Sequence, residues 1–114
     1  MSKRTPGLLL GDILLSLERI ATYVGAMDEQ SFARDTRTVD AVVLNLEIIG
    51  EAATRIPEEF KAGHPEVPWR RVVGLRNRIV HEYFGVDIGI VWSVVSHDLP
   101  QLRGQIQDIA DKLK

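Results

Sequence analysis

The chain has 114 residues, of which 45% are hydrophobic and 26% are charged, with a net charge of −2 and no cysteine. This composition predicts a single globular domain over residues 1–114, and it excludes disulfides, thiolate catalysis and cysteine-ligated zinc, which fits a reducing cytoplasm. The weakly acidic charge gives no global attraction for nucleic acid, so binding of that kind requires a local basic patch.

The first predicted helix runs from about residue 8 to 24 and ends at Gly25. The early apolar run Leu8–Leu10 is too short for a signal peptide or a membrane span, so no membrane association is expected. Residues 28–34 could add a short helical turn. The apolar positions of the first helix recur at helical spacing: Leu10, Ile13, Leu14, Leu17, Ile20, Ala21 and Val24.

The second predicted helix spans about residues 36–56 and has two apolar faces. Two such faces indicate a central helix, or a helix that also meets a partner subunit. Its main seam repeats at intervals of three and four residues: Val39, Val42, Leu46, Ile49, Ala53 and Ile56. A second stripe lies beside it: Ala41, Leu44, Ile48 and Ala52.

Two further helices are predicted after a loop region that begins at Pro57. The third covers about 68–83, because Pro68 suits a first helical position and Gly85 would stop the helix. The fourth covers about 88–113, with Asp87 as its cap and a kink at Pro100. Together the elements predict an all-α, up-and-down bundle of four to five helices. The fourth seam is Ile88, Val91, Val95, Leu99, Leu102, Ile106, Ile109 and Leu113.

Arg76 falls within the apolar stripe of the third predicted helix, on its core side. Arginine is rarely buried unless it is paired. Two interpretations therefore stay open. Arg76 could form a buried ion pair with Glu47, Glu51 or another carboxylate, or it could hold its guanidinium in a cleft to bind phosphate.

A basic patch beside Trp69 is the second candidate feature. It could hold phosphates while the aromatic ring stacks on a base. Arg71 and Arg78 project away from the apolar stripe, so ordinary surface salt bridges are the simpler interpretation for them. The patch comprises Arg70, Arg71, Arg76 and Arg78.

His81 has the titration range for general acid–base catalysis near neutral pH. On a straight helix it would lie about 140° away from Arg76. Joint action of the two residues would need the helix to unwind near His81, or a dimer in which two copies face each other. Asn77 shares the face of His81, and Tyr83 lies two turns beyond Arg76, where it could pack in the core, touch substrate or carry a modification. No spacing of histidines suggests a metal site.

These residues resemble the R-x4-H-x-Y motif of the HepT-like toxins, which belong to the HEPN superfamily of small helical RNases. The match is Arg76-x4-His81-x-Tyr83, and it is accompanied by flanking segments in the same order as in that family. The flanking segments are Asn45 to Ala52, Pro68-Trp69-Arg70, Phe84-Gly85-Val86-Asp87, Val91-Trp92 and Asp98-Leu99-Pro100.

The resemblance implies a homodimeric HEPN-like bundle with the motif in a cleft between subunits. It also implies metal-independent cleavage of RNA, either tRNA or mRNA, by attack of the ribose 2′-OH and without a cofactor. His81 would be the general acid or base, Arg76 would stabilise the phosphorane charge, and Asn77 would position the phosphate. Arg70 and Tyr83 are the further candidates for substrate binding.

The resemblance also implies a protein partner, an antitoxin of the MntA type, which is a minimal nucleotidyltransferase. That partner would transfer AMP to Tyr83, and the added phosphate beside Arg76 would block the substrate phosphate. Two alternatives remain. The chain could be a non-catalytic HEPN module that binds such a nucleotidyltransferase, or a purely structural helical dimer.

Overall fold

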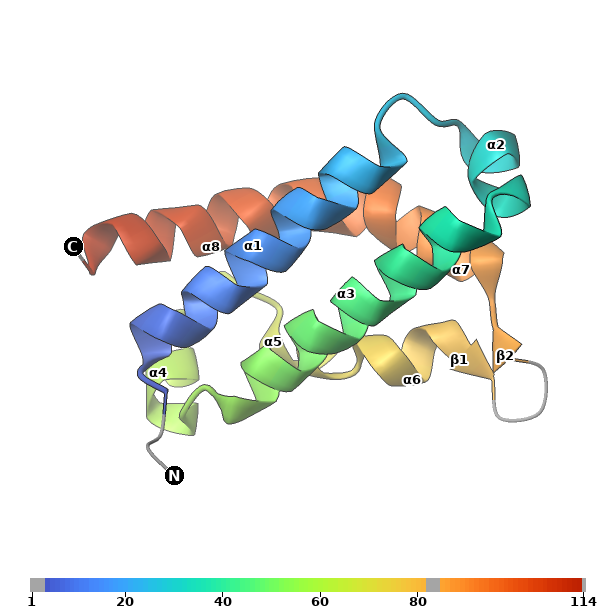
Figure 1. Cartoon of the computed structure of the whole chain (residues 1–114). Helices are drawn as coiled ribbons and strands as arrows, with labels where there is room; N and C mark the ends of the chain where they lie inside the picture. Colours follow the sequence, from blue (N-terminus) through green and yellow to red (C-terminus); the bar gives the residue numbers. More distant parts are fainter. Residues whose placement is uncertain (1–3, 82–84, 114) are drawn as a thin grey trace.

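Two long helices, α1 (Pro6–Val24) and α3 (Thr36–Arg55), pack side by side and form the centre of the fold (Figure 1). The computed structural model describes residues 4–81 and 85–113, and of His81 only the backbone. The predicted seam of α3 is confirmed, because all of its members are buried: Val39, Val42, Leu46, Ile49, Ala53 and Ile56. Of the second stripe, Ala52 is buried, whereas Leu44 is 57% exposed.

Local capping explains where these helices begin and end. The Thr5 hydroxyl accepts a hydrogen bond from the Leu8 N–H at 3.2 Å, and Gly25 ends α1 with a φ of +52°, a conformation that favours glycine. Asp28 and Ser31 cap the short helix α2 (Glu29–Arg34) reciprocally. The hydrogen bond from the Ser31 N–H lowers the pKa of the Asp28 carboxyl.

The third predicted helix, over residues 68–83, is wrong as a single element. After α4 (Glu58–Ala62), the chain forms two short helices, α5 (Trp69–Val73) and α6 (Leu75–Ile79), separated by Gly74. Both short helices contact α3. The chain then becomes extended in the two-residue strand β1 (Val80–His81), which pairs in antiparallel fashion with β2 (Gly85–Val86).

The last helical stretch is continuous but not uniform. It consists of α7 (Ile88–Ser93), a π-helical turn η1 (Val94–Asp98) and α8 (Leu99–Lys112), and it is capped by Asp87 as predicted. The wider turn comes directly before Pro100, which cannot donate to the hydrogen-bond ladder.

The π turn corrects the predicted seam. The Leu99 N–H bonds to the Val94 carbonyl, five residues back, and both side chains are buried. Val94 therefore takes the core position that the regular spacing had given to Val95, which is only partly buried. The end of the predicted seam is also wrong, because Leu113 is 50% exposed.

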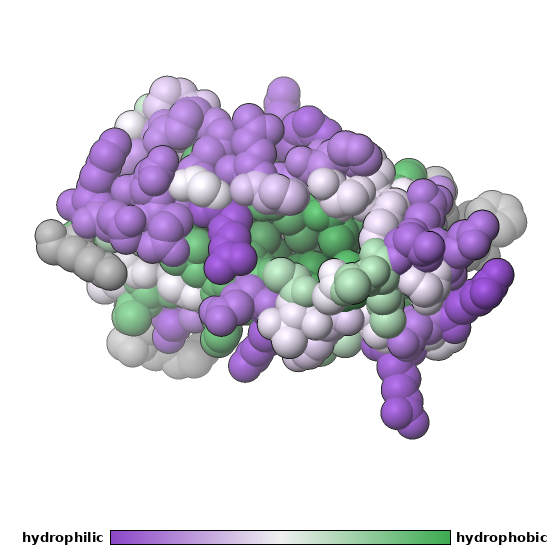
Figure 2. Space-filling view, turned by 90° about the horizontal axis from the view of Figure 1, so that it is seen from above, coloured by the Kyte–Doolittle hydropathy of each residue, from purple (hydrophilic) through white to green (hydrophobic). Residues whose placement is uncertain are grey.

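The elements form the predicted all-α bundle. Helix α8 lies beside α1, and α5 and α6 lie beside α3 (Figure 1). The view from above shows an apolar hollow with a largely hydrophilic surround (Figure 2). A cavity of about 260 Å³ lies between α1 and the junction of η1 with α8, where Leu17, Ile20 and Pro100 contribute to its wall. None of the described helices is both long and apolar enough to cross a membrane.

Candidate active site

The motif segment changes from helix to strand between its arginine and its histidine. Helix α6 ends at Ile79, and Val80 has φ −106° and ψ 121°, which is extended backbone. The Asp87 N–H donates to the Ile79 carbonyl at 2.8 Å, and His81 pairs with Gly85 in the short ladder. The helix thus ends before His81, and the angle of a straight helix no longer separates this residue from Arg76.

Arg76 is not on the core side, contrary to the sequence prediction. Its side chain is 66% exposed. The prediction assumed one continuous helix, but the break at Gly74 makes α6 a separate helix, on which the buried positions are Leu75 and Ile79. The spacing of the buried residues on α5 therefore does not predict which residues of α6 are buried.

The partner of Arg76 is Glu47, one of the two carboxylates considered from the sequence. The Arg76 Nε and the Glu47 Oε1 are 3.8 Å apart, which is a long ion pair at an exposed position. The other carboxylate, Glu51, instead pairs with Arg55 at 3.1 Å. The interpretation of Arg76 as a buried structural ion pair is therefore wrong, and its guanidinium is largely open to solvent.

Arg76 lies at the wall of a cavity of about 420 Å³ between α1 and α3. The charged side chains around this cavity are of both signs, since Asp12, Glu47 and Glu51 lie beside Arg4, Arg55 and Arg76. Its apolar lining is Leu9, Leu44, Ile48 and Ala52, so the outer stripe of α3 ends beside the motif arginine.

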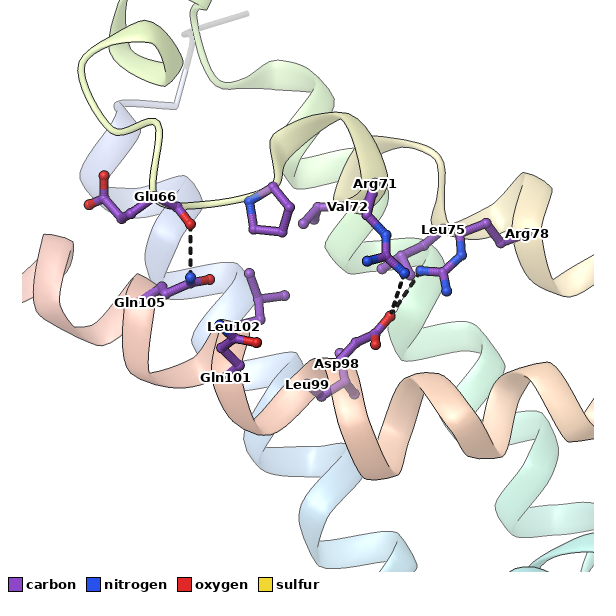
Figure 3. Close-up of a pocket in the computed structure, with 11 residues that line it drawn as sticks. Glu66, Arg71, Val72, Leu75, Arg78, Asp98, Leu99, Gln101, Leu102 and Gln105 are labelled. Atoms are coloured by element: carbon purple, nitrogen blue, oxygen red, sulfur yellow. Dashed lines mark hydrogen bonds and ion pairs between the residues drawn. The ribbon is translucent and has the colours of Figure 1, made fainter.

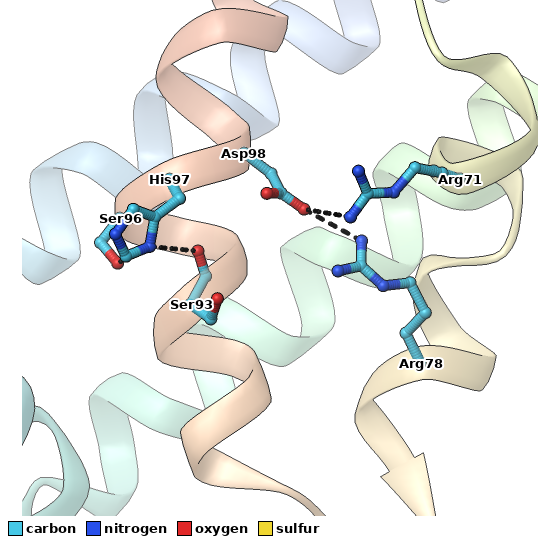
Figure 4. A network of polar contacts seen from close by, with 6 residues as sticks. All are labelled: Arg71, Arg78, Ser93, Ser96, His97 and Asp98. Carbon is cyan, nitrogen blue, oxygen red and sulfur yellow. Dashed lines mark hydrogen bonds and ion pairs between the residues drawn. The ribbon is translucent and has the colours of Figure 1, made fainter.

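The other members of the basic patch point in different directions. Arg70 and Asn77 are exposed, as a role in substrate binding requires. Arg71 and Arg78 both reach Asp98 at the end of η1, with Nη2 and Nη1 at 3.4 and 3.0 Å from its Oδ2 (Figure 4). This pairing agrees with the expected surface salt bridges, and it joins α5 and α6 to the last helical stretch.

Trp69 does not offer its ring for stacking on a base. It is 8% exposed, and its indole N–H donates to the His64 carbonyl at 3.0 Å. The suggestion of an aromatic platform beside the patch is therefore wrong. The ring instead fixes the start of α5 against the preceding loop.

The side chain of His81 and the whole of Tyr83 lie outside the described residues, so their proposed roles stay predictions. The histidines whose side chains are described have local contacts. The His64 ring lies against Phe60, with centroids 4.7 Å apart, and the exposed His97 lies 3.3 Å from the Ser93 carbonyl. Among residues 4–81 and 85–113, no group of three or more metal-ligating side chains comes together. The predicted independence of a metal stays a prediction.

Asp98 is the residue that sequence reasoning missed. It lies 20 positions from Arg78 and 27 from Arg71, so no local spacing reveals the pairing. The available signal was indirect, since Asp98 begins the Asp98-Leu99-Pro100 segment noted in the family resemblance.

The comparisons with known proteins identify the family of the chain. A probable ribonuclease HepT of Thermococcus cleftensis is 39% identical over 107 residues, which cover 94% of this chain and 97% of that protein. A protein described as a putative RNase of Caldanaerobacter subterraneus subsp. tengcongensis is 37% identical over 111 residues, covering 97% of this chain and 99% of that protein. No solved structure matches the chain significantly. The family model described as ribonuclease HepT-like matches residues 13–109, and the chain therefore belongs to the HepT-like ribonuclease family.

Proposed function

We propose that the chain is an endoribonuclease that cleaves RNA without a metal ion and acts as the toxin of a HEPN/MNT toxin–antitoxin pair. The observation that carries the proposal is the placement of Arg76. Its side chain is 66% exposed, and among the described residues its ion-pair partner is Glu47, at a long distance of 3.8 Å. It can therefore turn to a phosphate without leaving a buried carboxylate unpaired.

The proposed reaction is an internal transfer within the RNA strand. The ribose 2′-OH loses its proton and attacks the adjacent phosphorus, the P–O5′ bond breaks, and O5′ takes up a proton. The products are a 2′,3′-cyclic phosphate and a 5′-OH. His81 carries out one of the two proton transfers, and Arg76 stabilises the negative charge that accumulates on the phosphorane.

The exposed side chains around Arg76 have supporting roles in this proposal. Asn77 positions the reacting phosphate, and Arg70 binds the strand beside it. Tyr83 contacts substrate in the free toxin. In the inhibited toxin, an MntA-type nucleotidyltransferase attaches AMP to Tyr83, and the added charge excludes the substrate phosphate from Arg76.

The proposed protein is a homodimer, in which two copies of the motif face one cleft. The exposed Leu44 and the partly buried Ile48 on the outer stripe of α3 support this assembly, because they leave apolar surface beside Arg76. The ladder that turns the chain at Val80 supports a cooperation of Arg76 with His81, since the two residues no longer lie on one rigid helix.

The test is cleavage of a total tRNA pool by the purified chain in EDTA, with His81→Ala beside it and His97→Ala as a matched histidine control. We expect the wild type and His97→Ala to produce cyclic phosphate ends, and His81→Ala to produce none. If all three cleave equally, His81 is not the catalytic group. If none cleaves, although mass spectrometry finds no AMP on the chain, the non-catalytic module that binds a nucleotidyltransferase becomes the better account.

A further inference from the structure

A third cavity lies beside α6, with Leu75 and Arg78 of that helix in its wall. It has a volume of about 270 Å³ and separates α5 and α6 from the beginning of α8 (Figure 3). Its apolar wall is formed by Val72, Leu75, Leu99 and Leu102. Polar side chains surround that wall, so the cavity combines an apolar surface with nearby charge, as ligand sites do.

The charge in this cavity is concentrated on two arginines that converge on one oxygen atom. Arg71 and Arg78 come from different helices, yet both approach the Oδ2 of Asp98, at 3.4 and 3.0 Å (Figure 4). Two guanidinium groups face one carboxylate, so the trio keeps a charge of +1. Each guanidinium has five N–H donors, and a single carboxylate oxygen uses few of them.

The other carboxylate at this cavity does not cancel that charge. Figure 3 shows the Glu66 carboxylate directed away from the two arginines, while the backbone carbonyl of Glu66 accepts a hydrogen bond from the Gln105 amide at 2.8 Å. The remaining charge is accessible to a ligand, because the side chains of Arg71 and Arg78 are 61% and 31% exposed.

We propose that this cavity binds a backbone phosphate of the RNA strand through Arg71 and Arg78, with Asp98 as the competing anion that aligns the two arginines in the absence of RNA. The apolar wall then receives the ribose or base beside that phosphate. The inference rests on the proposed RNase function, and it adds a subsite away from the bond that is cleaved.

The position of the subsite follows from α6. Arg76 and Arg78 are two residues apart on this helix, and they pair with Glu47 on α3 and with Asp98 on η1 respectively. They therefore leave α6 on opposite flanks. A strand held at Arg76 for cleavage can cross α6 and meet Arg78 on the other flank, so the two arginines bind different phosphates of one RNA.

The test is binding of a labelled single-stranded RNA oligonucleotide to the full chain in a His81→Ala background, measured over a range of salt concentrations. Arg71→Ala and Arg78→Ala should each weaken binding about tenfold. Each should also reduce the slope of log affinity against log salt by about 0.7, the value for one phosphate contact on a single strand. Arg19→Ala on α1 is the matched control and should change neither quantity.

The Asp98→Asn variant tests whether Asp98 competes with RNA, because the proposal predicts that RNA affinity rises rather than falls. If Asp98 competes with RNA, its neutralisation should tighten binding about threefold, since the repulsion between two anions is removed. Glu18→Gln on α1 makes the same change in net charge and should leave binding almost unaltered. If Asp98→Asn instead weakens RNA binding, the ion pairs of Arg71 and Arg78 with Asp98 are structural, and the proposal is overturned. Arg78→Lys keeps the charge, and it should retain the salt slope even if Arg78→Ala folds poorly.

Two further outcomes separate this proposal from the proposed function. In the first, the variants have the predicted RNA affinities but the wild type does not cleave RNA. That result would support the subsite and reject the RNase function. Cleavage by the wild type, with binding unaffected by Arg71→Ala and Arg78→Ala, would keep the RNase and overturn the subsite. An absence of any RNA binding would overturn it as well.

Discussion

The central pair α1–α3 and the motif segment from Pro68 to Asp87 are stabilised by different interactions. The central helices are 19 and 20 residues long, have side-chain caps, and meet along buried aliphatic seams. The described part of the motif segment (68–81 and 85–87) has two five-residue helices without side-chain caps and two-residue strands. Three of its arginines, Arg71, Arg76 and Arg78, pair with partly exposed carboxylates. Stability is therefore concentrated in the first region, whereas the chemistry that we propose lies in the second.

This comparison makes substitutions in the core of α3 the most damaging for folding. Leu46 is fully buried, and Leu46→Ala should lower the free energy of unfolding by about 2–5 kcal/mol, because it leaves a cavity between α1 and α3. Chemical denaturation measures the loss. Leu15→Ala on α1 is the matched control, since Leu15 is 48% exposed, and equal losses for the two variants would contradict the comparison.

The motif arginine should show the opposite behaviour. Arg76→Ala removes a long, exposed ion pair, so we expect a loss of unfolding free energy below about 1 kcal/mol. Its RNA cleavage should fall by about 10²–10³-fold, as when a donor to a developing charge is removed. Parallel assays of RNA cleavage and of thermal unfolding test the two expectations. If the variant unfolds, Arg76 has a structural role after all.

The contact between the two regions is sensitive at Gly50. A Cβ atom at this position would lie 3.4 Å from the Val72 carbonyl and 3.6 Å from that of Val73, so α3 and α5 approach closely there. Gly50→Val should therefore displace α5 and cost about 1–3 kcal/mol through overpacking. Gly11→Val on α1 meets nothing within 4 Å and serves as the control, and a similar loss at both sites would mean that the close approach is unimportant.

The smallest effect is expected at Arg55. It forms an exposed pair with Glu51 one turn away on α3, and Arg55→Ala should cost about 0.3–0.5 kcal/mol in thermal unfolding. This variant lies in the same cavity as Arg76, and it should retain RNA cleavage. A large loss of cleavage would extend the phosphate site along α3 and weaken the special role given to Arg76.

The sequence predicted the regular helices well, because their signals are local. The seam of α3, the short helical turn over residues 28–34 and the cap at Asp87 depend on residues a few positions apart, and they agree with the structure. The third predicted helix failed, since the periodicity of its apolar residues runs across Gly74 without marking the break. That error placed Arg76 on the core side.

The candidate site could be predicted only in part, for the same reason. The motif residues and the pair of Arg76 with Glu47 were among the alternatives from the sequence, and the location of Asp98 against Arg71 and Arg78 was not. Contacts between residues 20 or more positions apart depend on how the helices pack, which the spacing of charged residues does not encode.

The π turn η1 has a consequence for insertions and deletions in this chain. In a π turn, residues five positions apart share a face, as Val94 and Leu99 do, whereas in an α-helix residues four apart do so. Removal of one residue from the segment 95–97 would therefore convert the turn to α-helix and keep both halves of the seam in phase. Removal of two residues would rotate the whole of α8 away from α1, so the length of this segment can vary by one residue but not by two.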